Sequence, residues 1–406
     1  MAFSHTHLVG AGVNDLGHFG VTPFRKTARN FEVYENGPWE TIDRKRNSTN
    51  RLWWSKFEKS SEYAHPGIYG VTLDDPNVEV ELLAISTMAG IHSYTWKDLS
   101  ATDFAALVID FCHTSKINAG ILNDRPCRDA TVTVAEDKLS FSAAVQIQGS
   151  LSGLLWTYLH AEIVLPTNSK RHLTWRTCTD IHLGSSCVSS SELSVIHSTS
   201  GTLISFVEFA TIGMMEKEDS SADGRTNRIM ENGDSSADGR PNSDFTVELH
   251  TAISFISEDM ALQNLLEARS GNADKIYSVF VDRTSSVWCE ALSALTLSPN
   301  PGDEDISRML FSAFYHTLMS PTSYSESGGY YIGLDKRTHN SFTEREALYG
   351  APQPNLESSY HFYSDLSLWD TFRSQHPWVL LTDEVRAVGI ARSVADMSTQ
   401  QGSFPR

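Results

Sequence analysis

A tryptophan and an aspartate stand side by side, Trp369 and Asp370, in the stretch HFYSDLSLWDTFRSQHP (361–377). Sugars present apolar C–H faces that are rimmed by hydroxyl groups. An indole ring offers a flat apolar surface to such a face, and a carboxylate can accept hydrogen bonds from hydroxyls. The pair could therefore bind a sugar. In the alternative interpretation, Asp370 pairs with Arg373 one helical turn later and Trp369 belongs to the core.

Histidines near the start of the chain form a second pattern. His5 and His7 are separated by one residue, so on a β-strand both would point to one face, as two ligands of a single metal ion must. Taken alone, such a pair belongs more often to an ordinary protein surface. His18 has a weaker claim in the loop that follows, and no spacing identifies Glu326 and Asp365 as a general acid and base.

The elements that must position these side chains change type along the chain. From Ile68 to about Ser257, β-branched and aromatic runs alternate with turn residues, without helical stretches between them. Many strands in succession predict an antiparallel β-sandwich. After Ser257, which can cap a helix, the apolar spacing becomes helical. The expected helices begin at about residues 258, 273, 304, 361 and 382, and the last ends before Gly402.

Apolar stripes mark the faces that these helices should bury. In the second expected helix the stripe includes Ile276, Phe280 and Val287, and in the third it includes Ile306 and Leu310. Side chains at such spacing lie on one side of a helix. We therefore expect the stripe of the second helix to be buried, and the stripe of the third to form its apolar face.

One polar segment interrupts the β region. Residues 213–244 contain the sequence DSSADGR twice, at 219–225 and at 234–240, and hold few apolar side chains. Such a segment cannot bury enough apolar surface to offset the entropy that is lost on ordering. We expect a disordered surface insertion.

Composition and charge limit the classes of function. The chain has 406 residues, 40% of them hydrophobic, and a formal net charge of −18 at pH 7. This charge disfavours nucleic acid and anionic membranes as partners, because both bind basic surfaces. No run approaches the ~20 apolar residues that a membrane-spanning helix needs. The first residues also lack the basic and apolar regions of a signal peptide.

The chain has five cysteines, and none of them form a C-x-x-C pair, so a structural zinc site is not expected. Cys178 and Cys187 are near enough in sequence to close a disulfide loop, but free buried thiols are the favoured prediction. Asn47-Ser48-Thr49 is a glycosylation sequon, which matters only in a secreted protein.

Several stretches together resemble a known family. They are FSHTHLVGAGVNDLGHFGVTP (3–23), EYAHPGIYGVTL (62–73), AISFISEDMALQNLLEA (252–268), FYHTLMSPTSYSE (314–326) and YSDLSLWDTFRSQHP (363–377). In type, order and spacing they resemble glycoside hydrolase family 92, the calcium-dependent exo-α-mannosidases, over nearly the whole chain. One departure is Ser93, which stands where the family usually has an arginine.

The resemblance implies how the chain is divided. It implies a β-sandwich over residues 1–257, a helical linker over 258–298 and the first part of an (α/α)6 catalytic barrel over 299–406. It also implies that both ends are cut. Family members have a leading segment before the FSHTH motif, and they continue past the present C-terminus, where the general acid and base lie. We therefore expect no catalytic residue in this chain.

The resemblance also implies a reaction. The complete enzyme would remove terminal α-linked mannose from N-glycan-type mannosides by inverting hydrolysis, with the help of a calcium ion. Most calcium ligands would lie beyond the C-terminus, and no metal ligand is assigned here. Trp369 and Asp370 match the family's Trp-Asp-Thr motif, whose aspartate holds the terminal mannose. His5 and His7 lie in a segment expected to line the cleft between sandwich and barrel.

An alternative function is a non-catalytic carbohydrate-binding protein that is built on the sandwich domain. The resemblance favours a secreted or lysosome-like compartment if a leading segment has been lost. The preferred mannosidic linkage and the oligomeric state do not follow from the residues.

Overall fold

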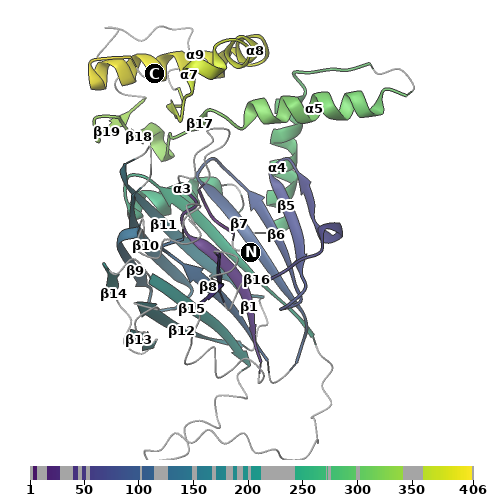
Figure 1. Cartoon of the computed structure of the whole chain (residues 1–406), viewed down its shortest axis with the longest axis vertical. Helices are drawn as coiled ribbons and strands as arrows, with labels where there is room; N and C mark the ends of the chain where they lie inside the picture. The colour runs from purple at the N-terminus through teal and green to yellow at the C-terminus, as the bar shows by residue number, and fades with distance from the viewer. Residues whose placement is uncertain are drawn as a thin grey trace, which may run out of the picture.

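The computed structural model places strands first and helices after them (Figure 1). It describes residues 3–6, 16–27, 40–43, 48–51, 55–100, 103–113, 127–148, 153–166, 171–179, 186–189, 195–199, 203–211, 243–270, 272, 276–298, 302–341 and 360–404. His7 and most of the predicted insertion lie outside these residues.

The larger of two main sheets has nine antiparallel strands in the order β14-β9-β10-β11-β16-β7-β6-β5-β4. Strand β16 closes the β region in sequence, yet it lies in the middle of this sheet, between β11 and β7. The strands are β4 (Tyr63–His65), β5 (Ile68–Leu73), β6 (Val78–Ala84), β7 (Ala89–Leu99), β9 (Cys127–Val134), β10 (Ser140–Gln148), β11 (Leu154–Val164), β14 (Val195–Ser198) and β16 (Ser243–Ser254).

The smaller main sheet has five antiparallel strands in the order β1-β8-β15-β12-β13. They are β1 (Gly20–Lys26), β8 (Phe104–Asp110), β12 (Arg171–Thr179), β13 (Ser186–Ser189) and β15 (Leu203–Thr211). A separate hairpin joins β2 (Glu40–Asp43) to β3 (Ser48–Arg51), and a 3-10 turn η1 spans Lys59–Ser61.

The two main sheets enclose one apolar core. Along β7 buried and partly exposed side chains alternate, so that Tyr94 and Trp96 point inward. The indole of Trp96 donates to the carbonyl of Phe24 in the other sheet, 3.0 Å away. Trp175 of β12 packs against Phe141 of β10 with ring centroids 5.2 Å apart. These contacts join the sheets into a sandwich.

Two helices cover the outer face of the larger sheet. Helix α3 (Glu258–Ala268) starts at Ser257, whose hydroxyl accepts from the Met260 amide as an N-cap. At its end Arg269 donates twice to the Glu162 carboxylate of β11, at 2.8 and 2.9 Å. Helix α4 (Tyr277–Leu292) buries Phe280 against the same sheet.

Short elements and helices complete the chain beyond α4, and α5, α8 and α9 lie beyond the end of the sandwich (Figure 1). They are α5 (Glu304–Leu318), β17 (Thr322–Ser323), η2 (Ser327–Gly329), β18 (Tyr330–Ile332), β19 (Thr338–Asn340), β20 (Tyr363–Ser364), α7 (Leu368–Thr371), α8 (Gln375–Thr382) and α9 (Glu384–Gln401). Helix α9 ends at Gly402, whose φ of 73° is left-handed, as helix-terminating glycines often are.

The predicted fold class, an antiparallel sandwich followed by helices, is confirmed. Strand β16 ends at Ser254 and α3 begins at Glu258. The division into three domains stays a prediction. The predicted C-terminal boundary of the insertion, residue 244, is two residues too late, because Ser243 and Asp244 belong to β16. Residues 213–242 lie outside the described part of the chain.

The single helix predicted over 361–377 is wrong. This stretch instead forms the short strand β20, the one-turn helix α7 and the start of α8. The Tyr363 amide donates to Ser393 Oγ, and β20 pairs with β17. Hydrogen bonds to distant residues therefore override the local helical spacing.

The predicted burial of the second helix stripe is partly wrong. Phe280 is buried, but Ile276 and Val287 of the same stripe are exposed. On α5, Ile306 and Leu310 of the apolar face are exposed as well. Periodicity identifies the apolar side of a helix, whereas coverage depends on a neighbour. In the described residues no element covers these positions fully.

The favoured prediction of free thiols at Cys178 and Cys187 is wrong. Cys178 and Cys187 face each other across β12 and β13 and form a disulfide, and Cys112 is joined to Cys127. Cys289 on α4 is a free, exposed thiol. Directly paired strand positions bring two Cβ atoms within disulfide reach, which the sequence separation alone could not establish.

Candidate functional site

The Trp369–Asp370 pair lies on helix α7, on the surface of the helical part. The side chain of Trp369 is 74% exposed, so the alternative that places it in the core is wrong. Asp370 is also exposed and accepts a hydrogen bond of 2.7 Å from the Ser367 hydroxyl. The Arg373 guanidinium lies over the Phe372 ring rather than against Asp370. Both members of the pair are thus accessible to a ligand.

The turn before α7 is held by a partly buried carboxylate. Asp365 accepts from the Thr322 amide at 2.8 Å and from the Thr322 hydroxyl at 2.6 Å. Its φ of 51° is left-handed, a conformation that aspartate tolerates better than most residues. Burial raises the pKa of Asp365, while the Thr322 hydrogen bonds and the Arg386 charge oppose that rise.

Arg386 of α9 contacts both the segment before β17 and strand β20. Its guanidinium donates to the carbonyls of Leu318 and Pro321, at 3.1 and 3.2 Å. It also lies over the Tyr363 ring of β20, 5.8 Å from its centroid. The end of α5, strand β20 and α9 therefore meet around one cation, close to the turn that leads into α7.

Glu326 is the most enclosed carboxylate of this region, with 6% of the residue exposed. One oxygen accepts from the Phe255 amide at 2.8 Å, and the other accepts from the Asn264 side chain at 3.0 Å. Burial raises the pKa of Glu326, and the hydrogen bonds from Ser254, Phe255 and Asn264 oppose that rise.

These contacts decide which carboxylates can reach a ligand. Both oxygens of Glu326 and both of Asp365 already accept hydrogen bonds from this chain. Asp370 differs, because its only partner among the described contacts is the neighbouring Ser367 hydroxyl. Of these three carboxylates, Asp370 is the one that can accept from sugar hydroxyls.

The N-terminal segment packs on the sandwich. His5 donates from Nδ1 to the Phe19 carbonyl at 2.6 Å, and its ring stacks on His92 of β7 with centroids 4.7 Å apart. His18 is buried, and its Nδ1 is 2.8 Å from the Thr157 hydroxyl. His7 lies outside the described residues, so the placement of both histidines around a sugar stays a prediction.

Ser93 occupies a position between two acidic strands. On β7 it pairs directly with Glu248 of β16 on one side and with Glu81 of β6 on the other. Glu248 is bound by His250 at 2.8 Å, and Glu81 accepts from the hydroxyls of Tyr63 and Tyr277. Side chains of this chain thus satisfy the acidic groups that flank Ser93.

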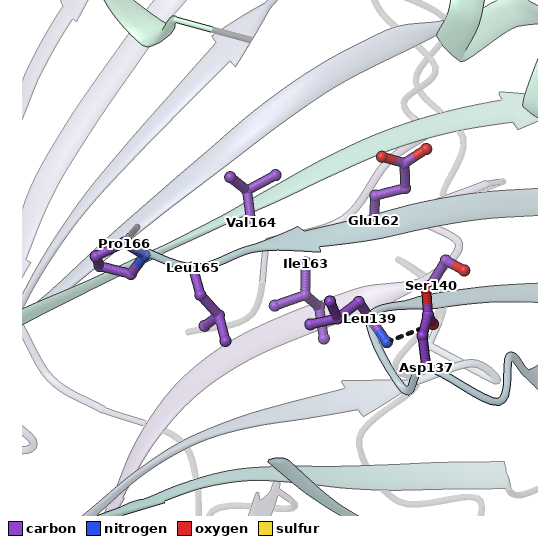
Figure 2. Close-up of a pocket in the computed structure, with 8 residues that line it drawn as sticks. All are labelled: Asp137, Leu139, Ser140, Glu162, Ile163, Val164, Leu165 and Pro166. Carbon is purple, nitrogen blue, oxygen red and sulfur yellow. Dashed lines mark hydrogen bonds between the residues drawn. The ribbon is translucent and has the colours of Figure 1, made fainter. Parts of the chain in front are cut away.

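A pocket of about 550 Å³ lies on the sandwich, between the turn before β10 and the C-terminal end of β11 (Figure 2). It is lined by Asp137, Leu139, Ser140, Glu162, Ile163, Val164, Leu165 and Pro166. Figure 2 shows Glu162 and Val164 on one side of β11 and Ile163 and Leu165 on the other. The sequence did not indicate this pocket, and it contains none of the predicted sugar-binding residues.

A calcium ion was expected from the family resemblance. Within the described ranges, no group of three or more histidine, cysteine, aspartate or glutamate side chains is arranged to hold a metal ion. We therefore assign no calcium ligand among the described residues and derive no chemical step through the ion. A helix long and apolar enough to cross a membrane is likewise absent from this part of the chain.

Sequence reasoning did not identify Asn264, Thr322 or Arg386 as parts of this corner. Asn264 did carry a signal, because it is a polar residue next to the buried Leu265 in the stripe of α3. A buried polar side chain in such a position usually has a specific partner. Thr322 and Arg386 carried no comparable signal, because their partners are 43 and 65 residues away.

Two models of one protein family match this chain. The model of the glycosyl hydrolase family 92 N-terminal domain matches residues 1–211, and the model of the family's catalytic domain matches residues 261–406. The curated proteins contain no match.

Solved structures share this fold. The GH92 α-mannosidase BT3965 from Bacteroides thetaiotaomicron has a TM-score of 0.68 and 20% identity, over 98% of this chain and 43% of its own. Its complex with mannoimidazole gives the same score and identity, with 41% of that chain covered. The inverting mannosidase BT2199 from Bacteroides thetaiotaomicron VPI-5482 has a TM-score of 0.60 and 16% identity, over 100% of this chain and 41% of its own.

The present chain therefore spans about two fifths of the length of these solved structures. At such low identity they establish the fold alone. The two family models match both the strand-rich part and the helical part, and together they span most of the chain. The chain belongs to glycosyl hydrolase family 92.

Proposed function

We propose that this chain is the sugar-binding part of a hydrolase that removes terminal α-linked mannose from N-glycan-type mannosides. The observation that carries the proposal is the exposed Trp369–Asp370 pair on α7, within the match to the catalytic domain. The related solved structures include an α-mannosidase bound to mannoimidazole and an inverting mannosidase. Their names support mannose as the sugar.

The proposed roles follow from the chemistry of the two side chains. The open face of Trp369 packs against the apolar C–H face of the pyranose. The Asp370 carboxylate accepts hydrogen bonds from sugar hydroxyls, and such charged hydrogen bonds are stronger than neutral ones. The Ser367 hydroxyl, which donates to Asp370, fixes the rotamer of that carboxylate before the ligand arrives.

Inverting hydrolysis needs two further carboxyl groups, roughly 6.5–9.5 Å apart on opposite sides of the scissile bond. One protonates the leaving oxygen and the other activates a water molecule. Glu326 and Asp365 are poor candidates, because donors of this chain occupy their oxygens. We place the acid, the base and most ligands of the calcium ion outside these 406 residues.

A binding measurement tests the sugar site. Methyl α-mannoside should bind the wild-type chain, and Trp369→Ala or Asp370→Asn should each weaken binding about 10-fold or more, as expected for loss of a charged hydrogen bond or an aromatic contact. Calorimetric or NMR titration provides the affinity. Val195→Ala and Asp259→Asn, at exposed positions outside α7, are the matched controls. Wild-type affinity in both α7 variants would remove Trp369 and Asp370 from the sugar site.

An activity measurement tests the location of the acid and base. The purified chain should release no mannose from an α-1,2-linked mannobiose, because it would bind sugar without the groups that cleave it. Chromatographic detection of free mannose is sufficient. Turnover that survives further purification and scales with the amount of chain would contradict this part of the proposal.

The sandwich pocket favours one second candidate, a non-catalytic carbohydrate-binding protein. Its lining combines the Asp137 carboxylate and the Ser140 hydroxyl with aliphatic walls (Figure 2). Aromatic side chains, the usual sugar platform, are missing from that lining, which makes this the weaker candidate. Sugar binding that survives Trp369→Ala but is lost in Asp137→Asn would favour it over the hydrolase.

The two disulfides favour one kind of cellular compartment. Cys112–Cys127 and Cys178–Cys187 are bonds of the kind that persist in oxidising environments. We include in the proposal that the protein functions outside the reducing cytosol, in a secreted or lysosome-like compartment. Mass spectrometry of the alkylated protein from its native source distinguishes paired cysteines from free ones.

A further inference from the structure

The joint between sandwich and helices is organised around one buried pair of side chains, Glu326 and Asn264. Glu326 lies in the segment between β17 and η2, and Asn264 lies on α3. The Asn264 side-chain amide donates a hydrogen bond of 3.0 Å to the Glu326 carboxylate. In Figure 1 α3 lies at the end of the sandwich that faces the helices, so this pair sits where the two parts meet.

The remaining bonds of the pair reach both parts. Glu326 accepts from the Phe255 amide just after β16, and the Asn264 amide group donates to the Ile253 carbonyl of β16 at 2.8 Å. On the other side, the Asn264 side-chain oxygen accepts from the Ser327 amide at 2.8 Å. Two side chains thus fix the end of β16, α3 and the segment before η2 in one arrangement.

A series of hydrogen bonds between the segment next to this joint and β20 reaches Asp365, three residues before α7 begins. The Phe362 amide donates to the Ser325 hydroxyl at 2.7 Å, and the Tyr324 amide donates to the Phe362 carbonyl at 2.8 Å. Further along the same strand pair, Thr322 holds Asp365. Asp365 precedes Asp370 by five residues in the sequence. The position of α7 is therefore tied to the sandwich through β17 and β20.

An apolar contact could hold the two parts together, but it would be less directional. A buried carboxylate is costly unless its hydrogen bonds are complete. Complete polar networks favour one arrangement over its neighbours, because a small shift leaves a donor or acceptor without a partner. The Phe255 and Tyr324 rings pack alongside, with centroids 5.1 Å apart.

We propose that Glu326 and Asn264 are positioning residues for the sugar site, which set the place of Trp369 and Asp370 relative to the sandwich. The proposal rests on the proposed function for its effect on sugar binding. The geometric part, in which the pair fixes β17, β20 and α7, stands on the contacts of this chain alone.

The test uses Glu326→Gln in the full chain. Glutamine keeps the size of the side chain but replaces one acceptor by an amide donor, which then faces either the Phe255 amide or the Asn264 amide group. We expect affinity for methyl α-mannoside to fall about 5-fold or more. We also expect faster hydrogen exchange at the amides of Phe255, Ser327 and Tyr363–Asp370, while the sandwich strands keep their protection.

Control and rescue variants separate positioning from a general loss of stability. Glu267→Gln removes an exposed carboxylate from the same helix α3 and should change neither measurement. The double variant Glu326→Gln with Asn264→Asp exchanges the two groups, so that glutamine can donate to aspartate and aspartate can still accept from Ser327. It should recover part of the lost exchange protection and affinity.

The possible outcomes distinguish the two proposals. If the wild-type chain binds no mannoside, the proposed function fails, and hydrogen exchange across Tyr363–Asp370 still decides the positioning role. If Glu326→Gln leaves that exchange unchanged, the positioning role is overturned. A third outcome is that the wild-type chain binds mannoside and Glu326→Gln changes the exchange but not the affinity. The pair would then fix the joint without positioning the sugar site, and its proposed role in sugar binding would be overturned.

Discussion

The sandwich and the helical part place their apolar side chains differently. The largest apolar residues of the sandwich, such as Trp96 and Trp175, are buried between the sheets. In the helical part Leu381 is 82% exposed and Val385 78%. The other exposed large apolar residues from α4 onward are Ile276, Val279, Val287, Ile306, Met309, Leu310, Phe311, Tyr330, Trp369, Phe372, Leu380 and Phe404.

The difference shows what each kind of element needs. A sheet buries one face as soon as a second sheet packs on it, and both sheets of the sandwich are in this chain. An amphipathic helix needs neighbours along its whole apolar stripe. Within the described residues, helix α5 has neighbours only toward its C-terminal end, where Phe314 packs against Trp378 of α8 with centroids 5.6 Å apart and Tyr315 packs against Trp288 of α4 with centroids 5.1 Å apart. Its first turns remain open.

The largest difference in stability should appear when a buried apolar residue of the sandwich and an exposed apolar residue of the helical part are each replaced by alanine. Trp96→Ala should lower the free energy of unfolding by about 3–5 kcal/mol, because it leaves a cavity beside Phe209 and Phe245. Leu381→Ala removes an exposed side chain and should change it by less than about 0.5 kcal/mol. Urea unfolding of both variants checks the contrast. Similar losses would mean that Leu381 is covered in solution.

The next effect concerns the disulfides, both of which join described strands or strand ends of the sandwich. Replacing Cys112 and Cys127 by serine should cost about 3 kcal/mol, the entropy expected for a loop of some 15 residues. Calorimetric melting of the oxidised proteins measures it. Cys289→Ser in the helical part, where the thiol is free, is the control and should melt like wild type. Equal melting of all three proteins would show that the bond is not formed.

Acidification should affect the sandwich, through His92, and its joint with the helices, through Glu326, in opposite directions. Burial, and the nearby His5, hold the pKa of His92 well below its usual range. The unfolded chain therefore takes up this proton more readily, and the sandwich should lose stability as pH falls below about 6.5. Glu326 has a raised pKa, so its contribution is retained at low pH and lost as pH rises through the folded-state value.

Hydrogen exchange at two pH values measures both responses region by region. His92→Phe should flatten the pH dependence of the sandwich, whereas His65→Gln, at an exposed position of β4, should not. A sandwich whose protection is the same at pH 5 and pH 7.5 would contradict the assignment to His92.

Charged substitutions on the exposed helix faces should have the smallest effect on stability but should clearly reduce self-association of the chain. Met309→Glu with Leu381→Glu places charges on the open faces of α5 and α8, and should reduce dye binding and light scattering without changing the unfolding midpoint. Val195→Glu, at an isolated exposed position of β14, is the matched control. An unchanged scattering signal in the double variant would show that these faces do not drive association.

Local signals in the sequence predicted part of this structure well. The Ser257 cap, the start of α5 after Asp303 and the end of α9 at Gly402 were all expected from residue types and spacing. Each depends on groups within a few residues of one another. The helix predicted over 361–377 was wrong because backbone amides of this stretch donate to Ser325 and Ser393. The periodicity of the stretch itself cannot indicate such distant partners.

The candidate site shows the same limit. The sequence singled out Trp369 and Asp370 as residue types suited to a sugar, and whether they bind one stays a prediction. A sugar contact requires an accessible indole, and Trp369 is exposed. Glu326 and Asp365 were left as carboxylates without a role, and their roles became clear only from donors on Asn264 and Thr322.

By itself, the sequence determined the order of strands and helices, the apolar side of each element and the resemblance to a family, because these depend on residue type and near neighbours. Tertiary structure alone decided the disulfide pairs, which positions of each helix face are covered, and the joint between Glu326 and Asn264. Those features depend on side chains far apart in sequence, 62 residues in the case of this pair, and their meeting is fixed by the packing of the whole chain.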